Sequence, residues 1–309
     1  MAVVLQVAVL FVAGCAWAFA FHPVLKLGRG ARLVWIWTTG ALLLASPRLI
    51  AGDHPFARFL AAISALAFTF KVADLHIGAT LGLRPTFGAF AGYVVNPGSA
   101  VLRKLHQAPR TTRTEDLKLL AAGGLAAAAS ASLFAAVVRV DWAAYPFALE
   151  HSVKVLSFFL VVLTAAPALE GLFRLVGFRV VKTMNRVYLS ATPAELWNRY
   201  NLLVHQLLYE NVFRVWGGRR APVRGTLAAF AVSAAAHEYL FSVATGRVRG
   251  LQAAFFLIQG AASAATLRVR PKGWRRAVGI VATLAFNLVT SVLFFDGINR
   301  IAPFYAPRP

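Results

Sequence analysis

Acidic residues and cysteine are scarce in this 309-residue sequence. It holds 11 Asp and Glu, and charged residues of both signs make up only 14% of it, against roughly a quarter in an ordinary soluble domain. The single cysteine, Cys15, excludes an internal disulfide. Because Cys15 lies in an apolar run far from the polar motifs described below, a covalent thiol mechanism is not expected.

Other common features are missing as well. We find no Walker A loop, zinc-protease motif, nucleophile elbow or internal repeat. No polar linker divides the chain, so we expect a single domain over residues 1–309. The string Val12-Ala13-Gly14-Cys15 looks like a lipoprotein cleavage box, but no Lys or Arg precedes it. We expect a retained first helix, and a cleaved signal peptide stays open as the alternative.

What the chain has in excess is positive charge and apolar side chains. Lys and Arg number 32, the formal net charge is +21, and 59% of the residues are hydrophobic. The basic residues lie between apolar runs and not on one polar module, so we expect no nucleic-acid partner. A protein that faces anionic membrane lipids has this distribution. Such loops also attract a phosphate-bearing ligand.

Eight stretches have the length and apolarity of membrane-spanning helices, although the third and seventh are short. They are Ala2–Phe21, Leu33–Ile50, Phe59–Leu75, Leu119–Val138, Val153–Phe173, Gly225–Thr245, Leu251–Leu267 and Ala277–Phe295. The prediction is therefore an all-α integral membrane protein with about eight transmembrane helices. The first, third, fifth and seventh connecting segments hold 23 Lys and Arg and the others 7. Since cytoplasmic loops are enriched in these residues, we expect those four segments inside and both termini outside.

The long segment before the sixth stretch predicts an additional cytoplasmic amphipathic helix, from about Pro193 to Arg214. Thr192-Pro193-Ala194-Glu195 reads as a capping box that begins it. Apolar residues then recur with helical period, and a second stripe carries neutral polar groups. That stripe consists of Asn198, Asn201, His205 and Tyr209. A helix lying flat on the membrane is an equally good interpretation of the pattern alone.

Titratable residues inside the apolar stretches are the other candidates. His237 and Glu238 lie well inside the sixth, where such residues are costly and usually functional. A histidine that only holds the helix bundle together is the alternative. Lys71, Asp74 and His76 lie near the end of the third stretch, and Lys154 lies near the start of the fifth. For these we favour charges that reach the interface.

Two strings carry a family resemblance. They are Trp197-Asn198-Arg199-Tyr200-Asn201-Leu202-Leu203-Val204-His205 and Ser233-Ala234-Ala235-Ala236-His237-Glu238-Tyr239. Together they resemble the signature of the membrane-bound O-acyltransferases, in the branch that contains wax synthases, sterol acyltransferases and diacylglycerol acyltransferases. The match covers about residues 192–259. It includes a weaker likeness at Phe255-Phe256-Leu257-Ile258-Gln259.

The resemblance implies acyl-CoA as donor and a lipid alcohol as acceptor, with no metal and no further cofactor. It places the catalytic histidine at His237 and the conserved asparagine at Asn201, with Asn198 as the neighbouring alternative. We further expect substrate contacts from His205, Glu238 and Gln259. The phosphates of CoA are expected near Arg214, Arg219, Arg220 or Arg224.

Three alternatives remain at this stage. A transporter would also carry intramembrane charges, although it predicts broken helices or repeated halves. A scaffold that keeps the fold without the chemistry is the second. The third is an acyltransferase that modifies the hydroxyl of a sugar, peptide or natural product. The oligomeric state is open.

Overall fold

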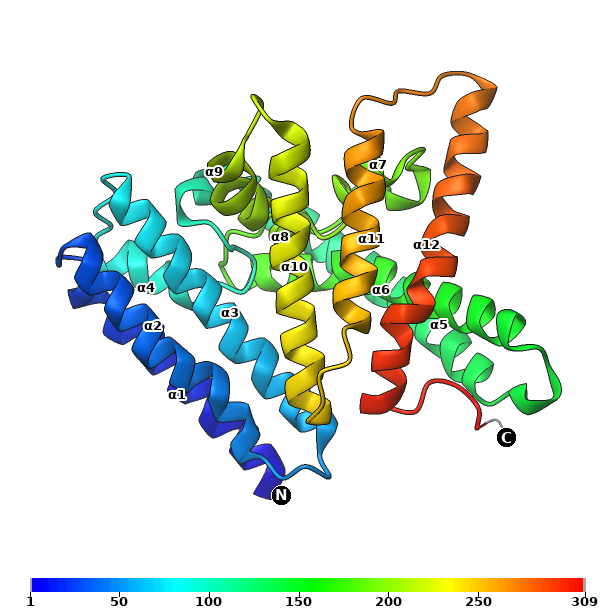
Figure 1. Ribbon diagram of the computed structural model, residues 1–309, viewed down its shortest axis with the longest axis horizontal. Coiled ribbons are helices and arrows are strands. Elements are labelled where there is room, and N and C mark those ends of the chain that lie inside the picture. The colour runs from blue at the N-terminus through cyan, green and yellow to red at the C-terminus, as the bar shows by residue number, and fades with distance from the viewer. Residues whose placement is uncertain (1, 308–309) are drawn as a thin grey trace.

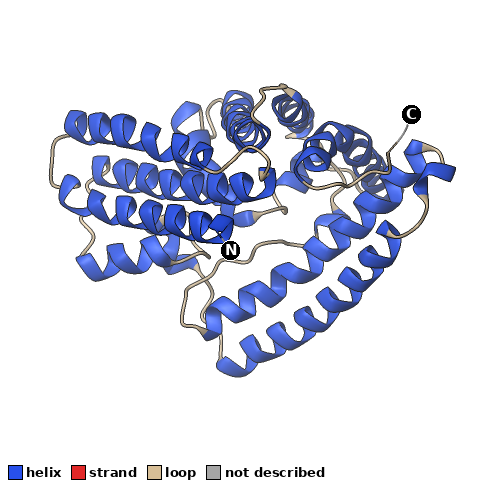
Figure 2. Cartoon of the chain, turned by 90° about the horizontal axis from the view of Figure 1, so that it is seen from below, coloured by secondary structure: helices blue, strands red, loops and turns tan. Residues whose placement is uncertain are grey.

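The computed structural model describes residues 2–307, and these form helices and loops without a strand (Figures 1 and 2). The helices are α1 Ala2–Val24, α2 Arg29–Ala45, α3 Pro55–Thr80, α4 Phe87–Val95, α5 Arg113–Val138, α6 Phe147–Leu175, α7 Pro193–Trp197, α8 Leu202–Leu208, α9 Arg214–Trp216, α10 Pro222–Thr245, α11 Leu251–Thr266 and α12 Trp274–Ile301. Residues Tyr209–Phe213 form a π-helical turn between α8 and α9.

Six of these helices are long and apolar enough to cross a membrane: α1, α3, α5, α6, α10 and α12. All eight predicted stretches contain a helix, but eight crossings are not confirmed. Helices α2 and α11 have 17 and 16 residues, so each is about 25 Å long, short of a hydrocarbon core about 30 Å thick. The third stretch is not short, because α3 runs for 26 residues. The architecture is that of a multi-pass membrane protein.

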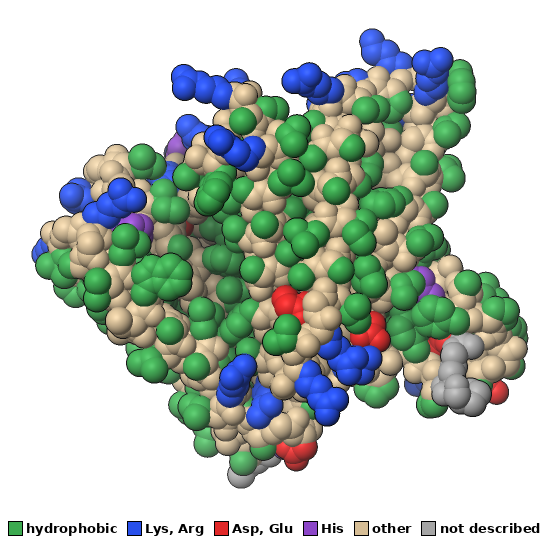
Figure 3. All heavy atoms as spheres, in the orientation of Figure 1, with side chains coloured by type: hydrophobic (Ala, Val, Ile, Leu, Met, Phe, Trp, Pro, Cys, Tyr) green, Lys and Arg blue, Asp and Glu red, His purple; other side chains and the backbone are tan. Residues whose placement is uncertain are grey.

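The helices form three groups. Helices α1, α2 and α3 pack side by side with α4 across one end, around a core that includes Phe21, Val72 and Phe90. Helices α10, α11 and α12 follow in order, and α10 also packs on α3. Helices α5 and α6 form a long antiparallel pair at the opposite edge (Figure 1). Basic side chains gather at both ends of α10–α12, and apolar side chains cover the surface between them (Figure 3).

Close approach of α5 and α6 depends on glycine. A Cβ atom at Gly123 would lie 2.7 Å from the backbone nitrogen of Ala168, and one at Gly171 would lie 2.7 Å from the carbonyl oxygen of Asp116. Neither neighbour is a flexible side-chain end, so only glycine allows the two backbones this spacing. Small residues serve the same purpose where membrane helices meet.

The predicted single helix from Pro193 to Arg214 is wrong. The chain turns after α7, because Asn201 adopts a left-handed conformation with φ 43° and ψ 62°, which ends regular helix. Asn201 then caps the new helix α8, its Oδ1 accepting a hydrogen bond from the Val204 N–H at 3.3 Å. Thr192 is the N-cap of α7 as expected, but the Glu195 carboxylate accepts from the Ala191 N–H, so the reciprocal half of the capping box lies one residue earlier.

The polar residues near the ends of α3 and α6 are buried inside the protein, which corrects the interpretation that they extend to the membrane interface. The Lys71 ammonium donates to the carbonyl oxygens of Tyr93, Asn96 and Ser99 at 2.8–2.9 Å. Asp74 is buried, accepts from the Leu102 N–H, and lies 3.3 Å from Arg103. Both side chains therefore fasten the chain after α4 to α3. His76, the third residue of the group, lies 3.4 Å from the Arg32 Nε.

A buried ion pair holds the chain that follows α12. Lys154 and Glu150, on successive turns of α6, are 2.7 Å apart and almost fully buried. Lys154 also donates to the Phe304 carbonyl, and Glu150 accepts from the Ala306 N–H. The residues after α12 are thereby bound across α6, so Lys154 is an interior residue and not a snorkelling one.

Candidate active site

A cavity of about 570 Å³ lies among α6, α10, α11, α12 and the segment from α7 to the π-helical turn. Its wall is mostly aromatic and aliphatic, with a few amide, hydroxyl and imidazole groups. Among the described residues that line it there is no Asp, Glu, Lys or Arg. A concave apolar site with few polar groups is the usual form of a small-molecule site, and here its chemistry suits a hydrocarbon chain.

His237 reaches this cavity from α10. Its Nδ1 lies 2.8 Å from the Ser233 carbonyl oxygen, one helical turn earlier. Because a carbonyl can only accept, Nδ1 carries the proton, and Nε2 of the neutral ring keeps its lone pair. The ring stacks on Phe256 with centroids 4.0 Å apart and meets the edge of Phe294 at 6.0 Å. Phe256 and Phe294 thus hold the ring in one orientation.

The polar stripe reaches the same cavity from the other side. Asn198, Asn201, His205 and Tyr209 all line it, although the helix that carries them is broken. The His205 Nε2 donates to the Asn198 Oδ1 at 3.0 Å. Asn201 uses its Oδ1 to cap α8, which leaves its amide Nδ2 available as a donor. Burial lowers the pKa of His205, so this imidazole is neutral near pH 7.

Glu238 and Gln259 were predicted as substrate contacts, but they lie behind the cavity wall. Glu238 accepts hydrogen bonds from the backbone N–H groups of Arg249, Gly250 and Ala253, and so caps the start of α11. Gln259 is fully buried and accepts from the Trp197 indole at 3.0 Å. Its amide also donates to Thr290 on α12. Both residues hold the helices that form the wall.

The predicted phosphate contacts lie outside the cavity. Arg214, Arg219 and Arg220 are exposed around the connection from α9 to α10, and none lines the wall. Arg214 is bound to Glu210 at 2.7 Å.

Sequence reasoning missed four polar residues of the wall, Thr226, Ser263, Asn287 and Ser291. Asn287 and Ser291 on α12 lie four residues apart on one helical face and both line the cavity. The Ser263 hydroxyl also lines it and has no hydrogen-bond partner among residues 2–307. The spacing of Asn287 and Ser291 within an apolar stretch was the available signal. A lone serine such as Ser263 gives little, since it can bond to its own helix.

No family model matches the chain. Over 133 residues the chain is 32% identical to the probable long-chain-alcohol O-fatty-acyltransferase 3 of Arabidopsis thaliana. The aligned part covers 38% of this chain and 39% of that protein's own length. This partial similarity supports a relationship to the wax synthase-like acyltransferases, in agreement with the resemblance carried by the two strings.

Proposed function

We propose that the protein is a membrane O-acyltransferase that moves an acyl chain from acyl-CoA to the hydroxyl of a long-chain alcohol. One observation carries the proposal. His237 and the Asn198–His205 stripe come from two segments that are separate in the sequence, and both lie on the wall of one uncharged cavity. The similarity to a plant protein named for this reaction supports it. Both substrate chains are hydrocarbons, which the apolar wall can enclose.

In this mechanism His237 acts as general base. Its Nε2 accepts the proton of the alcohol as the alcohol oxygen attacks the thioester carbonyl carbon. The carbonyl oxygen becomes an oxyanion, to which the Asn201 Nδ2 donates a hydrogen bond. The carbon–sulfur bond then breaks, and the CoA sulfur takes the proton back from the imidazolium. A positioned base typically contributes about 10²–10⁴-fold, and one oxyanion donor about 10²–10³-fold.

The other groups support these steps. The Ser233 carbonyl keeps the proton on Nδ1 of His237, so the reactive nitrogen stays basic. His205 and Asn198 hold each other in place beside Asn201. The nucleotide part of CoA is proposed to lie at Arg214, Arg219 and Arg220, where basic side chains meet water.

An acyltransferase acting on a sugar or other polar hydroxyl is the second candidate. The wall has only a few polar groups with which a sugar would form hydrogen bonds. Two of them, Asn287 and Ser291, lie together on one face of α12 and serve one place in the cavity only. A sugar has several hydroxyls to satisfy, and each one buried without a partner costs about 1–3 kcal/mol. The apolar lining therefore favours the alcohol with a long chain.

The test is ester formation in a host that lacks neutral-lipid synthases, fed with labelled fatty acid and a long-chain alcohol. The variants are His237→Ala and Asn201→Gly, with His106→Ala as the matched control. His106 is an exposed histidine outside the cavity. Glycine at position 201 keeps the left-handed backbone. It removes the Nδ2 donor together with the Oδ1 that caps α8, and glycine in place of such a cap costs only about a few tenths of a kcal/mol.

With membrane levels matched, we expect labelled wax ester from the wild type and from His106→Ala. His237→Ala should lose about 10²–10⁴-fold of it, and Asn201→Gly about 10²-fold. If His237→Ala makes as much ester as the wild type, the proposed base is wrong. If no alcohol yields an ester but a sugar does, the second candidate replaces the first.

A further inference from the structure

His237 lies at one end of the cavity and not at its middle. On α10 the cavity wall begins at Thr226 and ends at His237, which corresponds to about 16 Å of helix. The His237 ring stacks on Phe256 and meets the edge of Phe294. Phe295, next to Phe294, is the last residue of α12 that lines the cavity. Aromatic rings therefore close the cavity beside the proposed base, and the long part of the cavity extends to one side of it.

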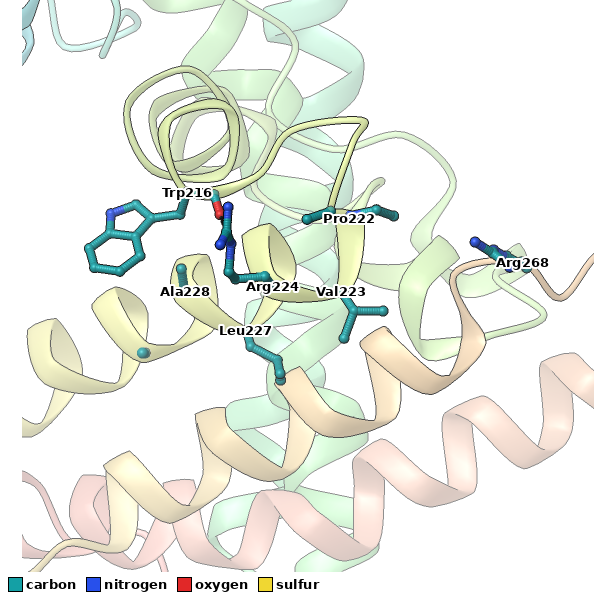
Figure 4. A pocket seen from close by; sticks show the side chains of 9 residues that line it. Trp216, Pro222, Val223, Arg224, Leu227, Ala228 and Arg268 are labelled. Carbon is teal, nitrogen blue, oxygen red and sulfur yellow. Dashed lines mark hydrogen bonds between the residues drawn. The ribbon is translucent and has the colours of Figure 1, made fainter.

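The long part leads to the basic end of α10. Thr226 lies in the second turn of this helix, which begins at Pro222. Figure 4 shows the outside of the molecule at this level, where Arg224 and Arg268 lie beside a surface groove. Leu227 of that groove does not line the cavity, so the two hollows lie on different sides of the helix. The CoA nucleotide is proposed to lie at this end, so the thiol arm of the donor would reach His237 through the long part.

The closed end of the cavity has two layers of aromatic rings. Phe295 and Phe158 of α6 line the cavity, with ring centroids 5.7 Å apart. Phe304 does not line it, but its ring centroid lies 4.7 Å from that of Phe295 and 6.2 Å from that of Phe158. Phe304 is only 6% exposed. Because such interiors leave few voids, the two inner rings cannot withdraw from the cavity while Phe304 stays in place.

Phe304 belongs to a strap, residues 302–306, that runs from the end of α12 across the start of α6 (Figure 1). The Lys154 ammonium donates to the Phe304 carbonyl oxygen at 2.7 Å. The hydroxyl of Tyr305 lies 2.6 Å from Nδ1 of His151, also on α6. The strap is therefore fixed to α6 by polar contacts, which hold the Phe304 ring against the closed end.

The proposed reaction needs room on both sides of the reacting carbon. The thioester carbon carries the thiol arm on one side and a hydrocarbon chain on the other. With the thiol arm in the long part of the cavity, the hydrocarbon chain meets the rings of Phe158 and Phe295. How far this chain extends depends on how far those two rings can withdraw, and Phe304 controls that distance.

We propose that Phe304 limits the length of the acyl chain that the protein accepts. It is a positioning residue, because it acts through Phe295 and Phe158 and does not line the cavity. The inference rests on the proposed acyltransferase function and adds a selectivity for acyl length. Phe304→Ala would leave a void behind the two inner rings, into which they can withdraw.

The experiment gives the full chain in vesicles one long-chain alcohol and an equimolar series of saturated acyl-CoAs, each two carbons longer than the last. The variants are Phe304→Ala and the milder Phe304→Leu, which keeps the test valid if the alanine variant fails to fold. Phe68→Ala is the matched control, since Phe68 is also 6% exposed but lies in the core of α1–α3 and away from the cavity. The length distribution of the esters is the readout, and it does not depend on the protein level.

A second arm measures binding without turnover. Thermal unfolding of each variant is followed with each acyl-CoA in turn and no alcohol. Each further methylene that the site buries should tighten binding about fourfold, up to the length at which the chain meets the closed end. The chain length that protects best therefore reports the limit even if no ester is formed.

We expect Phe304→Ala to shift both optima to acyl chains longer by about two to four carbons. Phe304→Leu should shift them about half as far, and Phe68→Ala should keep the wild-type profile. An unchanged profile in both Phe304 variants, or an equal shift in Phe68→Ala, would overturn the proposal. A shift found with a series of alcohols and not with the acyl-CoAs would overturn the assignment of the chain. If the wild type forms no ester but the binding optimum still shifts, the proposed function fails and the length limit stands.

Discussion

Glu238 stands next to the proposed base, yet its contacts assign it to stability and not to chemistry. Its carboxylate accepts three backbone N–H groups at the start of α11, from Arg249, Gly250 and Ala253. The N-cap residue Gly250 has no side chain to do this. Glu238→Ala removes all three acceptors. Losing a single cap costs about 0.5–2 kcal/mol, and a hydrogen bond to a charged group contributes about 1.5–3 kcal/mol.

Because Glu238 is half-buried, water can replace part of these hydrogen bonds in Glu238→Ala. We therefore expect the free energy of unfolding of this variant to fall by about 2–3 kcal/mol in total. For a chain of 309 residues this corresponds to a fall of roughly 3–5 °C in the unfolding temperature. Glu238→Gln keeps one acceptor oxygen and should lose about half as much. Thermal unfolding of the purified protein in detergent, followed by tryptophan fluorescence, measures the shift.

Ester formation by each variant is then measured well below its unfolding temperature and expressed per folded molecule. We expect Glu238→Ala to stay within about threefold of the wild type, since no interaction with the reacting atoms is lost. Glu115→Ala is the control, because Glu115 caps α5 at an exposed position through one backbone N–H, and its loss should be smaller. An unchanged unfolding temperature together with lost activity would refute this assignment and return Glu238 to the chemistry.

Three further changes test other contacts. Lys154→Met removes the cation facing the Glu150 carboxylate and should lower the free energy of unfolding, measured by denaturant titration, by about 3–5 kcal/mol. The double variant that also carries Glu150→Leu should regain much of this stability. If the single and double variants lose the same amount, the two charges are not paired. Gln259→Leu removes the acceptor of the Trp197 indole N–H and should raise the KM for the long-chain alcohol about fivefold with folding retained. An unchanged KM would show that this hydrogen bond does not shape the cavity. Burial lowers the pKa of His205 in the folded protein, so the unfolded chain binds a proton at a higher pH than the folded one. The free energy of unfolding should therefore fall as pH drops below about 6.5. A His205→Gln variant should lose this part of the pH dependence.

Apolar length and spacing predicted the helices well, because burial of an apolar surface in lipid leaves the backbone few choices. They could not predict the break at Asn201. Its neighbours have helical period, and asparagine is found both in helices and in left-handed turns. The same ambiguity affected Lys154, since a lysine near the end of an apolar stretch either reaches the interface or finds a partner. That choice depended on residues after α12, about 150 positions away.

The sequence motif correctly predicted that His237 and the polar stripe lie at one site, but it did not predict what each of its residues contacts. Gln259 and Glu238 belong to the same motif as the catalytic candidates, but their side chains form hydrogen bonds elsewhere. Gln259 bonds to α7 and α12, and Glu238 bonds to the start of α11. Which face of a helix meets the cavity depends on how the helices pack, and that information is spread over the whole chain.

No fixed charge lies on the cavity wall within the described residues, and this has a consequence for what the proposed enzyme would release. A neutral alcohol or ester enters without losing strong hydration, but a fatty-acid carboxylate would leave water with no cation to meet it, at a cost of several kcal/mol. Under the proposed reaction, fatty acid set free by accidental hydrolysis would therefore be driven out and would not compete with the substrates. The site would tolerate high fatty-acid levels and be inhibited instead by its own apolar product.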